Sequence, residues 1–197
     1  MMHLALNPEV QENLYNELQQ ALKLSSPDGK TITAATLEKK YTPYLHAVLR
    51  ENYRLTPPVA SVTTKTVSQG EVTVHGLTLS TGSVVSLENP WNIPSEQMPD
   101  AAEFKPERWL APAVEARKGT ALEVMDHALF RDSFGQGARR CPGSRVATLE
   151  VLAMTAQLVL DWKMQVPANI SNLHDVEHRM SAMISPILPP IKFTARN

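Results

Sequence analysis

The only cysteine of this chain, Cys141, lies between a glycine-rich turn and a predicted long helix. The proline that follows it suits the first turn of that helix, so the sulfur is expected beside the positive helix end, where unpaired N–H groups favour a thiolate. Gly135, Gly137 and Gly143 let the backbone fold tightly around the sulfur and approach a flat ligand closely. A lone cysteine by itself is more often a buried structural residue, but these neighbours indicate a metal ligand or an activated nucleophile.

The residues around this cysteine carry a family resemblance. Arg139 adds a fixed cation suited to a carboxylate, and the whole segment from Phe134 to Gly143 reads FGQGARRCPG. It resembles the haem-binding loop of the cytochrome P-450 superfamily at its Phe, second Gly, Arg, Cys and following Gly. The resemblance implies haem b as cofactor, with Cys141 as the axial thiolate ligand that favours O–O cleavage. It further implies that Arg139 binds a haem propionate and that Phe134 shields the sulfur.

Two charged motifs elsewhere support the same resemblance. Glu51 and Arg54 are three residues apart on a predicted helix, hence on one face, where an isolated pair stabilises by only about 0.2 to 0.5 kcal/mol. They look like the family's Glu-x-x-Arg, and Arg108 lies in a segment similar to its Pro-Glu-Arg-Trp. The resemblance implies that the three residues form one buried network, which is costly unless each charge is paired. We therefore assign Glu51, Arg54 and Arg108 to architecture and not to chemistry.

The elements that must position these residues are predicted to be mainly helical. Asn7 and Pro8 begin a helix to about residue 24, with Val10, Leu14 and Leu18 at i, i+4 and i+8. Thr42, as N-cap before a proline, begins a second helix over residues 43–55. A short helical stretch is expected at residues 37–40.

The second half alternates extended and helical patterns. Period-two alternation over residues 59–87 predicts a small antiparallel sheet, and proline-rich residues 89–114 predict extended or turn structure with one short helix. Residues 115–120 are expected to form a solvated loop. A long amphipathic helix follows Cys141, and the C-terminal tail suggests one or two strands. The helix is expected to carry an apolar stripe of Val146, Leu149, Ala153, Ala156 and Val159. The fold class is mainly α with a small antiparallel β-sheet.

Composition narrows the function classes. With 43% hydrophobic residues and a charge of 19 − 20 = −1, the chain has enough apolar side chains for a core and no basic face for nucleic acid. One cysteine excludes an intrachain disulfide framework and a zinc site of several thiolates. No stretch approaches the roughly 18 to 20 apolar residues of a membrane span, and the start lacks a leader, so the chain itself is expected to be intracellular. His174 and His178, at i and i+4, are interpreted as a solvated turn.

The resemblance runs through nearly the whole chain and implies the C-terminal part of the cytochrome P-450 fold. We therefore expect residues 1–197 to be a partial domain, lacking the upstream helix that crosses the distal haem face and not competent alone. The implied parent enzyme is a haem-dependent monooxygenase that acts on a small apolar organic substrate. Its association with a membrane, in mitochondria or the endoplasmic reticulum, is compatible with the resemblance. Its redox partner is a ferredoxin or an NADPH-dependent reductase.

Departures and alternatives accompany this interpretation. The loop sequence is closest to mitochondrial-type members, although Ser144 stands where those members usually have Arg. Thr64 and Lys65 occupy the region that usually offers an Arg to a propionate, and the residues from 89 to 92 differ from the usual basic or His-containing stretch. Arg50, with Lys39 and Lys40, is a candidate redox-partner surface. The alternative functions are a non-catalytic haem-binding or regulatory short form and a cysteine-nucleophile enzyme.

Overall fold

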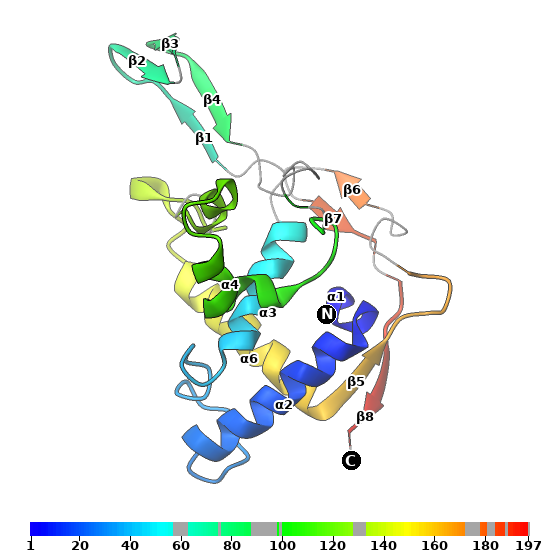
Figure 1. Ribbon diagram of the computed structural model, residues 1–197. Helices are drawn as coiled ribbons and strands as arrows, with labels where there is room; N and C mark the ends of the chain where they lie inside the picture. The colour runs from blue at the N-terminus through cyan, green and yellow to red at the C-terminus, as the bar shows by residue number, and fades with distance from the viewer. Residues whose placement is uncertain are drawn as a thin grey trace.

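Three helices form the body of the protein. The structure is a computed structural model that describes residues 1–56, 63–74, 76–87, 98, 100–127, 133–171, 178–180, 184–187 and 189–196. Helices α2 (Pro8–Ser25), α3 (Pro43–Leu55) and α6 (Ser144–Asp161) pack against one another, as Figure 1 shows. The short helix α1 (Met2–Leu6) precedes them. The prediction of a mainly helical fold with two long helices over residues 8–24 and 43–55 is confirmed.

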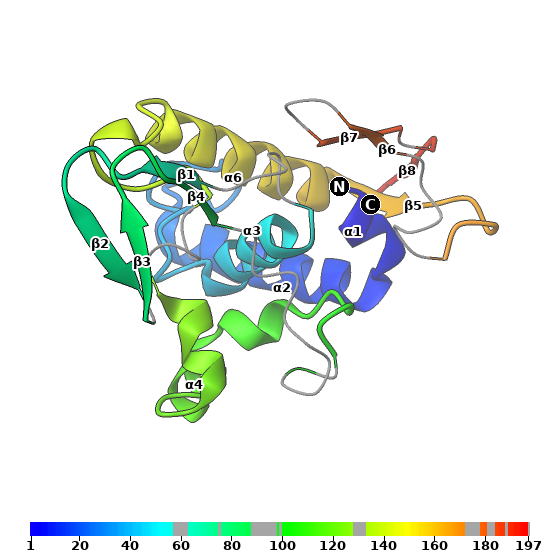
Figure 2. The same ribbon diagram turned by 90° about the horizontal axis from the view of Figure 1, so that it is seen from above.

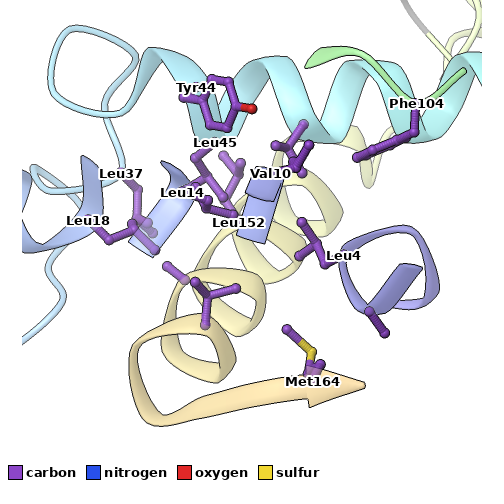
Figure 3. Packing of buried hydrophobic residues seen from close by; sticks show 14 residues of the cluster. Leu4, Val10, Leu14, Leu18, Leu37, Tyr44, Leu45, Phe104, Leu152 and Met164 are labelled. Atoms are coloured by element: carbon purple, nitrogen blue, oxygen red, sulfur yellow. The ribbon is translucent and has the colours of Figure 1, made fainter. Parts of the chain in front are cut away.

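The core lies where these helices meet (Figure 3). Leu14 and Leu18 of α2 are fully buried, as the i, i+4 spacing predicts, and Leu45 of α3 is fully buried opposite them. Leu152 contributes from α6. The strand after α6 closes the cluster through Met164, which is 1% exposed. Other buried members of the cluster are Leu4, Ala5, Val10, Leu37, Tyr44, Val48, Phe104, Ala156 and Val159.

The N-terminus of α3 is capped by a residue of another helix. The predicted cap, Thr42, makes no side-chain capping bond, and its hydroxyl donates to the Glu38 carbonyl instead. The Glu17 carboxylate of α2 accepts from the N–H groups of Tyr44 at 2.6 Å and Leu45 at 2.8 Å. The prediction of Thr42 as the capping side chain is therefore wrong, because a carboxylate from α2 already satisfies the first free N–H groups.

The start of α2 also lacks its predicted side-chain cap, because Asn7 bonds to α1. Asn7 does not cap α2, because its side-chain amide donates to the carbonyl of His3 at 2.8 Å. Gln11, which is 3% exposed, joins α1 to the strand after α6. Its amide nitrogen donates to the carbonyls of Leu4 and Met164 at 3.0 Å, and its oxygen accepts from the Met164 N–H at 2.8 Å. These bonds satisfy the polar atoms that burial of Gln11 removes from water.

The strands form antiparallel pairs, one of which packs against the helices through Met164. In the hairpin of residues 71–80, Val72 pairs with Leu79 and Val74 with Leu77, as the predicted period-two alternation requires. This hairpin projects away from the helices in Figure 1 and lies at the left edge of the molecule in the view of Figure 2. The pairs are β1 (Thr63–Thr66) with β4 (Val84–Leu87), β2 (Glu71–Val74) with β3 (Leu77–Ser80), β5 (Trp162–Gln165) with β8 (Lys192–Ala195), and β6 (His178–Met180) with β7 (Ile184–Pro186).

The local predictions between the long helices have different outcomes. Residues 34–41 form turns and a bend, so the helical stretch predicted at residues 37–40 is wrong. The segment predicted as extended or turn structure with one short helix holds the 3-10 turn η2 (Pro106–Trp109) and the short helix α4 (Ala111–Ala116), which agrees with the prediction, although α4 includes the start of the expected solvated loop. A second 3-10 turn, η3 (Ala121–Asp126), follows. Arg117 is only 8% exposed, because its guanidinium binds a carboxylate of η3. Residues 115, 116 and 118–120 are exposed as predicted, so the prediction of a solvated loop fails only at Arg117.

Helix α6 differs from the amphipathic prediction. Ala156 and Val159 are buried as expected, but Val146 is 61% and Leu149 48% exposed. Met154, on a further face, is 64% exposed. A helix that is apolar on several faces is typical of a fully enclosed position, and the residues described here cover only one side of α6. No helix among the described residues has the length and apolar character that spanning a bilayer requires.

Candidate functional site

The cysteine loop is closed by backbone hydrogen bonds. The Cys141 N–H donates to the Phe134 carbonyl at 3.0 Å, and the Ser144 N–H donates to the Cys141 carbonyl at 3.3 Å. Gly135 and Gly137 have φ values of 80° and 73°, in the left-handed region that glycine adopts without strain. The chain therefore reverses before the cysteine, as the glycine pattern indicates, and enters α6 after a short turn at residues 142–143.

The sulfur lies at the entry to α6. Pro142 belongs to the turn before the helix, which begins at Ser144 with Gly143 as its N-cap residue, so the predicted position of the proline inside the first helical turn is wrong. A Cβ added to Gly143 would lie 3.9 Å from the Cys141 sulfur, an ordinary contact. Gly143 therefore leaves this side of the sulfur open. Cys141 itself is exposed and free.

Phe134 joins the loop to α3. Its ring packs edge-on against Tyr53, with 6.0 Å between the ring centroids and 83° between the planes. Burial raises the pKa of the Tyr53 hydroxyl. The backbone of Arg139 lies in the 3-10 turn η4 (Gly137–Arg139), but its side chain lies outside the described part of the structure. The contact of Arg139 with a propionate therefore stays a prediction.

The structure brings Glu51, Arg54 and Arg108 together. The Glu51 carboxylate is fully buried and accepts two bonds from the Arg54 guanidinium, both at 2.8 Å, and one from Arg108 Nε at 2.8 Å. The Lys105 backbone N–H donates at 3.1 Å and the Trp109 indole N–H at 2.7 Å. The sequence motifs pointed to the three charged residues, whereas the last two donors come from the fold of η2. We call these five residues the Glu51 network.

The electrostatics of the Glu51 network follow from its pairing. Burial alone would raise the pKa of Glu51, but the hydrogen bonds and charge of Arg54, with the charge of Arg108, outweigh it and lower that pKa. Arg54 also donates to the Glu103 carbonyl at 3.2 Å. The buried anion is thus held ionised by two cations, which is the condition for tolerating such charges in a core.

A second cluster surrounds the face of Trp109. The guanidinium carbon of Arg50 lies 3.8 Å from the centroid of the indole ring, and that of Arg117 lies 5.0 Å away. Both arginines bind Asp126, Arg50 at 3.2 Å and Arg117 at 2.5 and 2.7 Å. We call Arg50, Trp109, Arg117 and Asp126 the Trp109 clamp. No sequence motif predicted this cluster, because its members come from α3, η2, η3 and the turn after α4.

The clamp gives Arg50 a role that the sequence did not predict. The Arg50 side chain is 19% exposed and lies on Trp109, and its place in a redox-partner surface stays a prediction. Lys39 and Lys40 are exposed, and Lys40 pairs with Glu38 at 2.8 Å. Thr64 and Lys65 are exposed on β1.

Two further sequence predictions fall where the structure gives little information. His178 lies in β6, but its side chain lies outside the described part of the structure, as does the whole of His174. Residues 89–92 also lie outside the described residues. The interpretation of the histidine pair as a solvated turn therefore stays a prediction.

The donor chemistry of the loop fits haem better than a metal ion held by protein ligands alone. Among the described residues no group of three or more His, Cys, Asp and Glu side chains could hold a metal ion. A porphyrin brings its own nitrogens, so that one soft sulfur is enough to complete its iron site. Cys141 supplies that sulfur in an open position, and the exposed Val146 adds apolar surface five residues further on.

The structure matches a solved haem protein fold. The chain aligns with the cyanobacterial protein CYP120A1, determined with bound retinoic acid, at a TM-score of 0.74 and 24% identity. The alignment covers 99% of this chain and 40% of that chain. At this identity the likeness shows the fold alone, which is the cytochrome P450 fold.

Sequence comparison shows the family. The cytochrome P450 family model matches residues 1–193. Cytochrome P450 71A18 of Arabidopsis thaliana is 33% identical over 174 residues, which are 86% of this chain and 32% of that relative. The mitochondrial 1,25-dihydroxyvitamin D(3) 24-hydroxylase of Mus musculus is 35% identical over 166 residues, which are 84% of this chain and 28% of that relative. This chain therefore belongs to the cytochrome P450 family, and it spans about a third of the length of these relatives.

Proposed function

We propose that this chain is the haem-binding part of a monooxygenase that inserts one atom of O₂ into an organic substrate. The observation that carries the proposal is the closed loop that presents the exposed Cys141 sulfur at the start of α6 in a member of the cytochrome P450 family. Family membership supports this function over a cysteine-nucleophile enzyme.

Each loop residue has a defined part in the proposal. Haem b, when bound, supplies the reductive activation of O₂. Cys141 is the axial ligand, and the two backbone bonds around it fix the position of its sulfur. Phe134 shields the sulfur from one side while Tyr53 holds the Phe134 ring. Arg139 pairs with a propionate.

The Glu51 network has a positioning role in the proposal. It ties α3 to η2 through a carboxylate that no solvent reaches. The chain then continues from η2 through η3 toward the cysteine loop. Glu51, Arg54 and Arg108 are therefore proposed to keep this route in place and to take no part in the reaction.

We further propose that residues 1–197 form the proximal part of a cytochrome P450 domain. The share of the relatives that the chain matches, 28 to 32% for the two named here, supports this division. The exposed apolar residues of α6, Val146 and Met154 among them, agree with a fold that has further parts to pack against. Groups that protect the distal haem face and deliver protons would then come from other residues than those described.

The substrate and the electron donor are proposed by class only. The substrate is a small apolar organic molecule, and electrons come from a ferredoxin or an NADPH-dependent reductase. The mitochondrial location in the name of the Mus musculus relative agrees with the mitochondrial-type resemblance of the loop, which implies a ferredoxin, whereas plant relatives such as cytochrome P450 71A18 match the chain about equally well. Purified full gene product with each donor in turn would distinguish the two by the rate of haem reduction.

The test of haem ligation uses Cys141 variants of the full gene product. The reduced, carbon monoxide-bound protein should show a thiolate-type Soret band that Cys141→Ala abolishes. Cys141→Ser should keep some haem with an altered spectrum, because an alcohol oxygen is a weaker and harder donor than a thiolate. Met154→Ala is the matched control, since it removes a sulfur that belongs to α6 and lies outside the cysteine loop, and it should leave the band intact.

The outcomes separate the candidate functions. A wild-type protein without the thiolate-type band contradicts the proposal, and so does a Cys141→Ala variant that still oxygenates a substrate. If the 197-residue chain alone shows the band but incorporates no ¹⁸O from ¹⁸O₂ into any apolar test substrate, it acts as a haem-binding short form. Turnover by the isolated chain would overturn the division into a proximal part.

A further inference from the structure

Trp109 belongs to two clusters at once. Its indole N–H donates to the Glu51 carboxylate at 2.7 Å, while the face of its ring carries the Arg50 guanidinium at 3.8 Å and that of Arg117 at 5.0 Å. The side chain is 7% exposed. The edge and the face of one buried ring therefore serve the Glu51 network and the Trp109 clamp separately.

Asp126 makes the clamp possible. Two guanidinium groups near one ring repel each other unless an anion lies between them. Asp126 Oδ1 accepts from Arg50 at 3.2 Å and from Arg117 at 2.7 Å, and its Oδ2 accepts from Arg117 at 2.5 Å. Arg50 also donates to the carbonyl of Met125 at 2.8 Å. Burial would raise the pKa of Asp126, but the bond and charge of Arg117 and the charge of Arg50 lower it, so this anion stays ionised.

The clamp lies on the route to the cysteine loop. Asp126 is the last residue of η3, and Phe134, eight residues later, opens the loop that ends at Cys141. Asp126 and Phe134 both contact the same helix, α3. Arg50 of α3 holds Asp126, and Tyr53 of α3 holds Phe134. Residues three apart lie on one face of a helix, so α3 fixes both ends of the connection from one face.

We propose that Trp109 and Asp126 are positioning residues that set the angle and reach of the Cys141 sulfur toward haem. They do so by fixing the start of the chain segment that enters the cysteine loop. The inference rests on the proposed haem-thiolate function and adds to it a second anchor. That anchor is distinct from the Glu51 network, because it needs the ring face of Trp109 and the charge of Asp126, and neither is required to pair Glu51 with its two arginines.

The two anchors can be separated by substitution. Trp109→Phe keeps a ring face for the arginines and removes the N–H that Glu51 accepts. Trp109→Leu removes both. Asp126→Asn removes the shared charge and leaves the indole in place, whereas Asp126→Glu keeps the charge. The matched control is Asp161→Asn, which changes an exposed carboxylate at the end of α6 that accepts from Gln157 at 2.8 Å.

The measurement is made on the full gene product reconstituted with haem. Total haem is determined after denaturation, and the share of it that shows the thiolate-type Soret band is read from the reduced, carbon monoxide-bound spectrum. We expect Asp126→Asn and Trp109→Leu to lose most of the thiolate band at unchanged total haem. Asp126→Glu should restore it, Trp109→Phe should retain more of it than Trp109→Leu, and Asp161→Asn should match wild type. Loss of the thiolate band at unchanged total haem is a result that loss of folded protein alone does not produce.

The outcomes distinguish failure of the positioning role from failure of the proposed haem-thiolate function. If the wild-type protein lacks the thiolate band, the haem-thiolate function fails. If wild type shows the band and Asp126→Asn keeps it in full, the positioning role fails while the function stands. Equal spectra for Trp109→Phe and Trp109→Leu would show that the ring face has no part in it. Should Trp109→Leu yield no folded protein, the Asp126→Asn and Asp126→Glu pair decides the matter.

Discussion

Replacing Glu51 by Gln should remove a large part of the folding stability of this protein. The carboxylate is fully buried and lies within 2.8 Å of two guanidinium groups, those of Arg54 and Arg108. An amide removes the negative charge and turns an N–H donor toward arginine donors. Breaking a buried charge pair by removing one partner costs about 3 to 5 kcal/mol, out of a total stability of about 5 to 15 kcal/mol.

Urea unfolding followed by circular dichroism measures the effect of Glu51→Gln. Glu107→Gln is the matched control, because Glu107 lies in the same segment and accepts from the Tyr44 hydroxyl but is exposed. We expect the control to lose about 1 kcal/mol, as for a single hydrogen bond. A Glu51→Gln loss no larger than that of the control would refute the reasoning that the network is a buried, mutually dependent charge cluster.

Two further predictions concern the helix termini and pH. Glu17→Ala should lower the free energy of unfolding by about 1 to 2 kcal/mol, whereas Glu17→Gln should lower it by less, since its amide oxygen still caps α3 and burial already raises the pKa of Glu17; chemical denaturation of both variants tests this. His3 is buried against Phe104, and burial lowers its pKa from 6.5 to about 4. Between pH 6.5 and pH 4 the imidazole of His3 therefore binds a proton in the unfolded chain but not in the folded one. The free energy of unfolding should fall by up to about 3 kcal/mol over this pH range. His3→Phe should flatten this part of the stability curve, and an unchanged slope would contradict the assignment.

The sequence predicted those parts of the fold that depend on residues close together in the chain. Pro8 and Pro43 mark helix starts because proline suits a first turn, and the predicted bounds of α2 and α3 match the structure to within a residue. The Val72 and Leu79 alternation predicts a strand pair for the same reason, since period two is a local property.

The parts that sequence missed depend on distant residues. Glu17 caps α3 from another helix, and nothing near Thr42 announces it. Arg117 reads as a solvated charge, yet the fold supplies Asp126 as its partner. Helix α6 was assigned a single buried face because periodicity alone cannot say which faces a neighbouring element covers.

The candidate site divides in the same way. The spacing of Cys141 within its glycine-rich loop and of Glu51 to Arg54 is readable because each lies within one short motif. The Trp109 clamp could not be predicted from the sequence, since the arginines reach the Trp109 ring only after α3 and η3 have packed beside η2.

Iron X-ray absorption of the haem-loaded full gene product tests the central claim most directly. The account predicts one sulfur atom in the first shell of the iron, in addition to the porphyrin nitrogens, and predicts its disappearance in Cys141→Ala. Because Cys141 is the only cysteine among these 197 residues, any other sulfur they offer would come from methionine. A first shell of nitrogen and oxygen alone in the wild-type protein, or a sulfur that persists in Cys141→Ala, would contradict the assignment of Cys141 as the axial ligand.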